Sequence, residues 1–81
     1  MELAEHNIRV NAIAPGIIET ELTRPYQYDS RVMEKINHNI PLKRWGKPHH
    51  IVRTVDMIIK NDYLTGSTLV VDGGWTSGKS L

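Results

Sequence analysis

The side chains that most often carry acid–base or metal chemistry are present in this chain, but their spacing does not assemble a site. The four histidines form neither an HExxH motif nor a pair at i and i+4, so we expect no metal site, and exposed or capping histidines are the simpler interpretation. The aspartates and glutamates show no paired arrangement that would indicate carboxylate catalysis. The chain has no cysteine, which excludes disulfides and thiolate ligands. The histidines are His6, His38, His49 and His50.

A loop that follows a predicted strand is the better candidate for binding chemistry. Residues 8–14 are mostly apolar and rich in β-branched side chains, and Pro15 and Gly16 end the run abruptly, as is typical of an inner strand of a parallel sheet. In open α/β sheets, ligands bind at the carboxyl ends of the strands, because the loops there converge on a crevice that the helices do not fill. Taken alone, the segment is better explained as an ordinary strand-to-loop junction.

The elements around this loop alternate between strand and helix. We expect the end of a helix over residues 1–7, a strand over 8–14, a helix over 48–61 and a last strand over 67–72. Asp29 or Ser30 can cap a further helix between them, whose apolar stripe ends before Pro41. Two strands separated by helical sequence predict a right-handed βαβ crossover with parallel strands. The fold class is therefore α/β.

Composition limits the classes of protein to consider. A chain of 81 residues makes at most one small domain, and 40% hydrophobic and 23% charged residues are ordinary for a soluble globular segment. No apolar run is long enough to cross a membrane, and the acidic first residues do not match a signal or transit peptide, so the expected location is cytoplasmic. The net charge is +1, and the chain lacks the strongly basic face and the reader motif of a nucleic-acid-binding protein. We expect no nucleic-acid partner.

Three motifs in a fixed order resemble one family. They are the run Arg9 to Thr20 with its Asn, Pro-Gly and Thr, the run Pro41 to Pro48 with its Pro-Leu, Arg and Gly-x-Pro, and the run Thr65 to Gly74 with its Val-Asp-Gly-Gly ending. Together they resemble the C-terminal part of a short-chain dehydrogenase/reductase, a nicotinamide-dependent oxidoreductase similar to glucose dehydrogenases and 3-oxoacyl-carrier-protein reductases. The resemblance implies the C-terminal βαβ portion of a Rossmann-type, doubly wound parallel sheet, incomplete in this chain.

The resemblance also implies a cofactor site. Residues 15–45 would hold a nicotinamide loop and a substrate flap, and the cofactor-binding residues would be Pro15, Gly16, Ile18 and Thr20. The main chain of Ile18 would bond the carboxamide of NAD or NADP, while the Thr20 hydroxyl would hold the carboxamide or the diphosphate. Gly16 would permit close main-chain approach. The aromatic side chains Tyr26, Tyr28 and Trp45 could line a substrate pocket or pack on the neighbouring helix.

The family's catalytic groups have no counterpart in this sequence. None of the three tyrosines is followed by lysine four positions later, and the glycines do not form the family's phosphate loop. We therefore assign no catalytic residue and expect the chain alone to be inactive. It would be a fragment of an NAD(P)-dependent enzyme that interconverts an alcohol and a carbonyl by hydride transfer, associating with a missing N-terminal part or forming a homo-oligomer. The alternative is a non-catalytic interaction module that associates with an intact relative.

Overall fold

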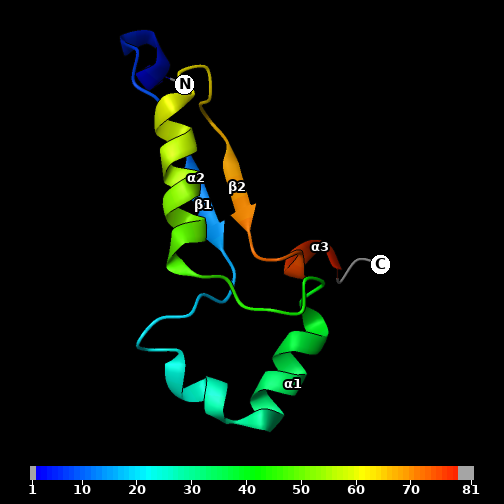
Figure 1. Cartoon of the computed structure of the whole chain (residues 1–81). Coiled ribbons are helices and arrows are strands. Elements are labelled where there is room, and N and C mark those ends of the chain that lie inside the picture. The colour runs from blue at the N-terminus through cyan, green and yellow to red at the C-terminus, as the bar shows by residue number, and fades with distance from the viewer. Residues whose placement is uncertain (1, 79–81) are drawn as a thin grey trace.

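A computed structural model describes residues 2–78, and its two strands form the parallel βαβ unit that the sequence predicts (Figure 1). The strands pair in register from Ala12 opposite Thr68 to Pro15 opposite Val71. The helix between them runs back along the sheet, as a parallel connection requires. The elements in chain order are η1 (Glu2–His6), β1 (Ala12–Pro15), η2 (Arg24–Tyr28), α1 (Ser30–Asn39), α2 (Pro48–Lys60), β2 (Thr68–Val71) and α3 (Trp75–Gly78).

The first strand begins later than predicted, at Ala12 rather than at residue 8. At the preceding residue, the side chain of Asn11 makes the contacts to the other segment: its Nδ2 donates to the Leu64 carbonyl at 3.0 Å and its Oδ1 accepts from the Ser67 amide at 3.1 Å. The backbones also meet here, because the Gly66 amide donates to the Val10 carbonyl at 2.8 Å, so the side-chain bonds of Asn11 lie between two backbone contacts in the segment just before the strand. The helix expected over 48–61 and the strand expected over 67–72 differ from α2 and β2 by one residue at each changed end. The predicted helix end at 1–7 is the short 3₁₀ helix η1.

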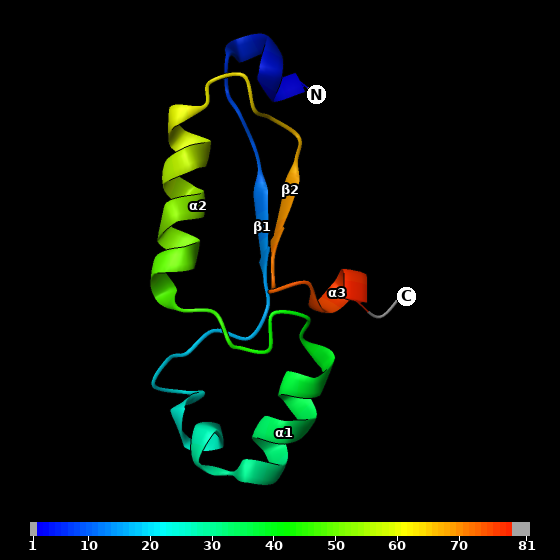
Figure 2. The ribbon, with the colours of Figure 1, turned by 45° about the vertical axis from the view of Figure 1, so that its right-hand side comes forward.

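The segment between β1 and α2 forms a small helical lobe beyond the carboxyl ends of the strands (Figure 2). Of the two predicted caps, Asp29 is the one used: its carboxylate accepts from the amides of Arg31 and Val32 at 3.1 and 3.3 Å. The chain then turns at Ile40 and returns toward the sheet. The lobe therefore stands over the edge at which the predicted cofactor loop leaves β1.

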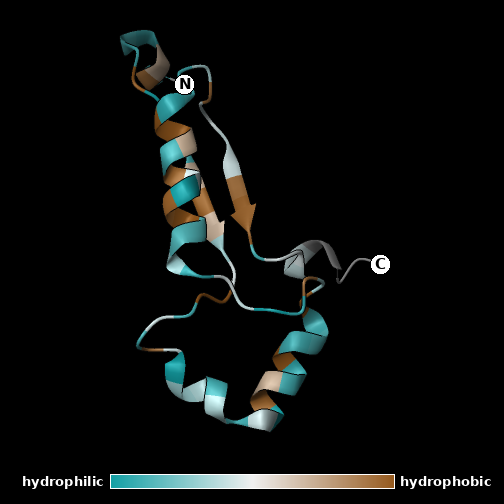
Figure 3. Ribbon diagram, in the orientation of Figure 1, coloured by the Kyte–Doolittle hydropathy of each residue, from teal (hydrophilic) through white to brown (hydrophobic). Residues whose placement is uncertain are grey.

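The best-buried side chains lie at the junction between the lobe and the βαβ unit. Ile40 is 2% exposed and Trp45 is 5% exposed, and they are the buried hydrophobic residues of the described part of the chain. The radius of gyration is 15.7 Å, against about 12 Å for a compact domain of this length. The ribbon is brown at the apolar residues of α2 and the strands in Figure 3, and several of these residues are at least two-fifths exposed. The chain is thus elongated and holds together at one junction.

Candidate functional site

The two strands end side by side, and Gly16 makes this possible. The Gly16 amide donates to the Val71 carbonyl at 2.9 Å. A Cβ at Gly16 would lie 2.7 Å from both Cα and Cβ of Asp72, which is too close for any other residue without a backbone shift. Gly16 is therefore needed within the fold, because only a residue without a side chain allows the two backbones to approach. Its predicted role toward a nicotinamide would be a second, separate role.

The loop after β1 is held by a second backbone pairing, between Ile18 and Gly46 in parallel orientation. The Gly46 amide donates to the Ile17 carbonyl at 2.9 Å, and the Glu19 amide donates to the Gly46 carbonyl at 2.8 Å. In such a pairing, the backbone groups of the central residue point away from its partner. The N–H of Ile18 has no hydrogen-bond partner among the described residues, and so it is available on the edge facing away from Gly46.

Thr23, which was not predicted from the sequence, organises the next turn. Its hydroxyl donates to the Ile18 carbonyl at 2.7 Å and accepts from the Thr20 amide at 2.8 Å. The Thr20 hydroxyl lies 3.4 Å from that of Thr23 and stays exposed. A Thr-x-x-Thr spacing is the signal that could have identified this turn. The structure therefore brings Pro15, Gly16, Ile18 and Thr20 into one ordered loop.

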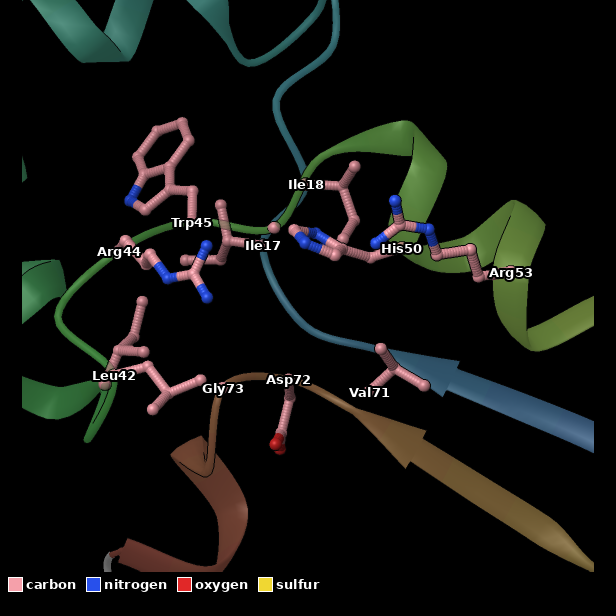
Figure 4. Close-up of a pocket in the computed structure, with 12 residues that line it drawn as sticks. Ile17, Ile18, Leu42, Arg44, Trp45, His50, Arg53, Val71, Asp72 and Gly73 are labelled. Atoms are coloured by element: carbon pink, nitrogen blue, oxygen red, sulfur yellow. The ribbon is translucent and has the colours of Figure 1, made fainter.

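A cavity of about 210 Å³ lies on the Gly46 side of this loop (Figure 4). Apolar side chains form much of its wall, with the guanidinium of Arg44 beside Ile17 and that of Arg53 beside His50. Trp45 lines it, whereas Tyr26 and Tyr28, 56% and 84% exposed, do not. The lining residues are Ile17, Ile18, Ile40, Leu42, Arg44, Trp45, Gly46, His50, Arg53, Val71, Asp72 and Gly73.

The carboxylate of Asp72 serves the turn after β2. It accepts from the Gly74 amide at 2.9 Å and from the Thr76 amide and hydroxyl at 3.0 and 2.8 Å. The hydrogen bonds from Thr76 lead the causes that lower the pKa of this carboxyl. Asp72 therefore starts α3, an element that was not predicted from the sequence.

The start of α2 borders the cavity and carries two histidines. The Nδ1 atom of His50 accepts from the Lys47 amide at 2.8 Å, and the His50 amide donates to the Lys47 carbonyl at 2.9 Å. The rings of His49 and His50 are 4.2 Å apart. Desolvation, followed by repulsion from His50, lowers the pKa of His49. Exposed or capping histidines were the simpler expectation from the sequence, and His50 is a capping one.

Arg9 fixes the other end of α2, a role that the motif resemblance did not identify. Its guanidinium donates to the carbonyls of Ile58 and Leu64 at 2.9 and 3.0 Å and to that of Asn61 at 3.1 Å. A cation at a helix C-terminus also interacts favourably with the helix dipole. Arg9 and Asn11 together tie the chain before β1 to the turn that leads into β2.

The described part of the chain has neither a metal-ion cluster nor a membrane-spanning helix. No group of three or more histidine, cysteine, aspartate or glutamate side chains is placed to hold a metal ion within that part of the chain. None of the helices described has the length and apolarity needed to span a membrane.

Comparison with known proteins agrees with the parallel βαβ unit and its loop. A structure of 4-hydroxyisoleucine dehydrogenase complexed with NADH superimposes with a TM-score of 0.91 at 44% identity, covering 95% of this chain and 32% of that one. A gluconate 5-dehydrogenase from Burkholderia cenocepacia J2315, in complex with NADP and tartrate, gives a TM-score of 0.82 at 33% identity, covering 94% of this chain and 31% of that one. The fold is the C-terminal βαβ portion of a Rossmann-type dehydrogenase.

Sequence comparison then gives the family. The family model described as enoyl-(acyl carrier protein) reductase matches residues 1–76. Carbonyl reductase family member 4 of Xenopus laevis is 44% identical over 73 residues, covering 90% of this chain and 29% of that protein. The 2-dehydro-3-deoxy-D-gluconate 5-dehydrogenase of Bacillus subtilis is 44% identical over 78 residues, covering 94% of this chain and 31% of that protein. The chain belongs to the short-chain dehydrogenase/reductase family and spans less than a third of the length of these relatives.

Proposed function

We propose that this chain forms the nicotinamide-binding wall of an NAD(P)-dependent oxidoreductase that interconverts an alcohol and a carbonyl. The observation that carries the proposal is the Ile18 backbone, whose N–H is unpartnered among the described residues at the carboxyl end of two parallel strands. Similar solved enzymes contain NADH or NADP. Ligands of open α/β sheets bind at this edge.

The residues of the loop suit a planar amide. The Ile18 N–H can donate to the carboxamide oxygen, and the Ile18 carbonyl keeps a second lone pair beside its bond from Thr23. The exposed Thr20 hydroxyl can donate to the carboxamide or the diphosphate. When bound, the cofactor supplies the hydride that is exchanged with the substrate carbon. The chain's own contribution is to fix one face of the ring, and no residue of the sequence is assigned to proton transfer.

The lobe of η2 and α1 is the proposed substrate flap. It stands over the carboxyl edge of the strands, and its two exposed tyrosines have room to contact a bound molecule. Small-molecule alcohols or carbonyls are the proposed substrates. The cytoplasmic location remains a prediction. So does the association with a missing N-terminal part or with a second copy of this chain.

A chimera tests the cofactor role. Residues 1–78 would replace the matching C-terminal segment of the Bacillus subtilis relative, and the dissociation constant of NADH would be measured by fluorescence. Removing one neutral hydrogen bond costs about 1 kcal/mol, so Thr20→Val is expected to weaken binding about fivefold. Glu21→Ala, one residue further along an exposed turn, is the matched control. Equal affinity of the two variants for NADH would contradict the role of Thr20.

The exposed apolar surface of α2 and β2 favours the alternative of an interaction module. Val52, Ile59 and Val70 are 65%, 66% and 55% exposed. Such a module would bind an intact relative without binding NADH itself. Size-exclusion chromatography with and without the full-length relative separates the two proposals, because only the module is expected to comigrate with the complete enzyme.

A further inference from the structure

The start of α2 is an unusual place for a histidine cap. Asp and Glu side chains are favoured in the first turn of a helix, because the helix dipole is positive there. In a capping box, a Glu or Gln three residues after the cap accepts from the cap residue's amide. Here His50 makes that bond with Nδ1, at 2.8 Å from the Lys47 amide nitrogen. Only the ring form that carries no proton on Nδ1 can accept it.

The capped residue is next to the backbone pairing that holds the cofactor loop. Lys47 follows Gly46, whose amide and carbonyl bind Ile17 and Glu19 at 2.9 and 2.8 Å. The Lys47 ammonium also lies 3.3 Å from the Glu19 carboxylate. A Cβ at Gly46 would be 3.7 Å from the Nδ1 atom of His50, so the ring lies directly against this pairing. His50 therefore supports the strand-like segment 45–47 from the side of α2.

The charges around the ring come from four parts of the chain. The cationic or titratable groups are His49, whose ring is 4.2 Å from that of His50, Lys47, whose amide the ring accepts from, and Arg44 and Arg53, which line the same cavity. The anions are Glu19, which is paired with Lys47, and Asp72 at the end of β2, which is bonded to α3. Neither carboxylate has a recorded hydrogen bond to the His50 ring. Among the described residues, neither carboxylate is therefore bonded to the ring in a way that would accept a proton added to Nδ1 of His50.

We propose that neutral His50 positions the nicotinamide loop through the start of α2, and that protonation of its ring releases this constraint. In the neutral ring, Nδ1 accepts a hydrogen bond from the Lys47 amide. A protonated Nδ1 is itself a donor, and two donors cannot form a hydrogen bond with each other. The Lys47 amide would lose its partner, and the Gly46 pairing with Ile17 and Glu19 would lose its support. His50 is a positioning residue in this account. A consequence for cofactor affinity rests on the proposed function, whereas the motion of the loop does not.

Nuclear magnetic resonance of the ¹⁵N- and ¹³C-labelled 81-residue chain tests the proposal between pH 5 and 8. The ring nitrogen shifts of His50 report its protonation and tautomer, and the amides of Gly46, Lys47 and Glu19 report the pairing. At pH 8 we expect the proton on Nε2. On acidification, the chemical shifts of the three amides should change with the same midpoint pH as the ring nitrogen shifts of His50. Hydrogen exchange at the Glu19 amide should accelerate several-fold.

Two variants and a control separate this role from a general effect of acid. His50→Gln keeps an accepting oxygen that does not titrate in this range, so the three amides should lose their pH response while the fold is kept. His50→Glu serves the same purpose if the glutamine variant does not fold. His49→Gln is the matched control and should leave the response unchanged. The proposal is overturned if the proton lies on Nδ1 at pH 8, if the amides follow His49, or if they titrate equally in the His50 variants.

Discussion

Replacing Arg9 is expected to detach the C-terminus of α2 from the chain before β1. Its guanidinium makes two part-buried bonds, to the carbonyls of Ile58 and Leu64 at 2.9 and 3.0 Å. At about 1 kcal/mol net for each, Arg9→Ala should lower the free energy of unfolding by about 2 kcal/mol, with the exposed bonds adding little. Both bonds come from the single nitrogen Nη1, and Arg9→Lys keeps the charge on a shorter side chain that lacks the fixed direction of the guanidinium donors, so about half of this loss is expected.

Urea denaturation followed by far-UV circular dichroism measures the effect. With a slope of about 1 kcal/mol per molar urea for a small protein, Arg9→Ala should lower the midpoint by about 2 M and Arg9→Lys by about 1 M. Arg31→Ala is the matched control, because its exposed side chain makes no recorded bond in the described structure. The reasoning is refuted if Arg9→Ala behaves like the control. A lysine variant as stable as the parent would show that charge alone, and not the reach and direction of the guanidinium, stabilises α2.

Three further predictions concern the junction, the end of β2 and the exposed surface. A Cβ at Gly46 would lie 2.6 Å from Cδ1 of Ile18, so Gly46→Ala should cost about 1–3 kcal/mol of unfolding free energy, and less in an Ile18→Val background that removes this atom. Thermal denaturation of the single and double variants would contradict this if the costs simply added. Because the folded-state pKa of Asp72 lies below its ordinary value of 3.8, its contribution to stability is present above pH 4 and is lost as the pH falls through the folded pKa. Acid unfolding of Asp72→Asn should accordingly be less steep than that of the parent, and an identical acid transition would count against the assignment. The second edge of β1 is unpaired in the two-stranded sheet of residues 2–78, beside exposed apolar side chains, so the purified chain should self-associate in analytical ultracentrifugation. A single monomeric species at high concentration would contradict this.

Local patterns in the sequence predicted the elements that depend on neighbouring residues. The apolar spacing of α2, with Pro48 in its first turn, placed the helix within a residue, and Asp29 was one of two predicted caps for α1. The predicted strand was longer than β1. The spacing of apolar residues does not reveal that the side chain of Asn11 bonds to Leu64 and Ser67 just before the strand.

Only the parts of the candidate site that coincide with a sequence motif could be predicted. The Pro-Gly run placed the loop at the carboxyl end of a strand, and the structure agrees. The contacts that order this loop join residues distant in sequence, such as Ile18 with Gly46, or depend on a rotamer, such as the Thr23 hydroxyl. Spacing alone does not encode such contacts. The short helix α3 was missed for a similar reason, since it depends on the orientation of the Asp72 carboxylate.

The central claim is that the loop from Pro15 to Thr20 contacts the nicotinamide ring, and a nuclear Overhauser measurement tests it most directly. The chimera with the Bacillus subtilis relative would carry labelled isoleucine methyl groups and would be mixed with NADH. The account predicts transfer from the nicotinamide protons to the methyl groups of Ile18 or Ile17, and none to those of Ile59, which is exposed on α2. Bound NADH whose nicotinamide protons show no transfer to either loop residue would contradict the claim.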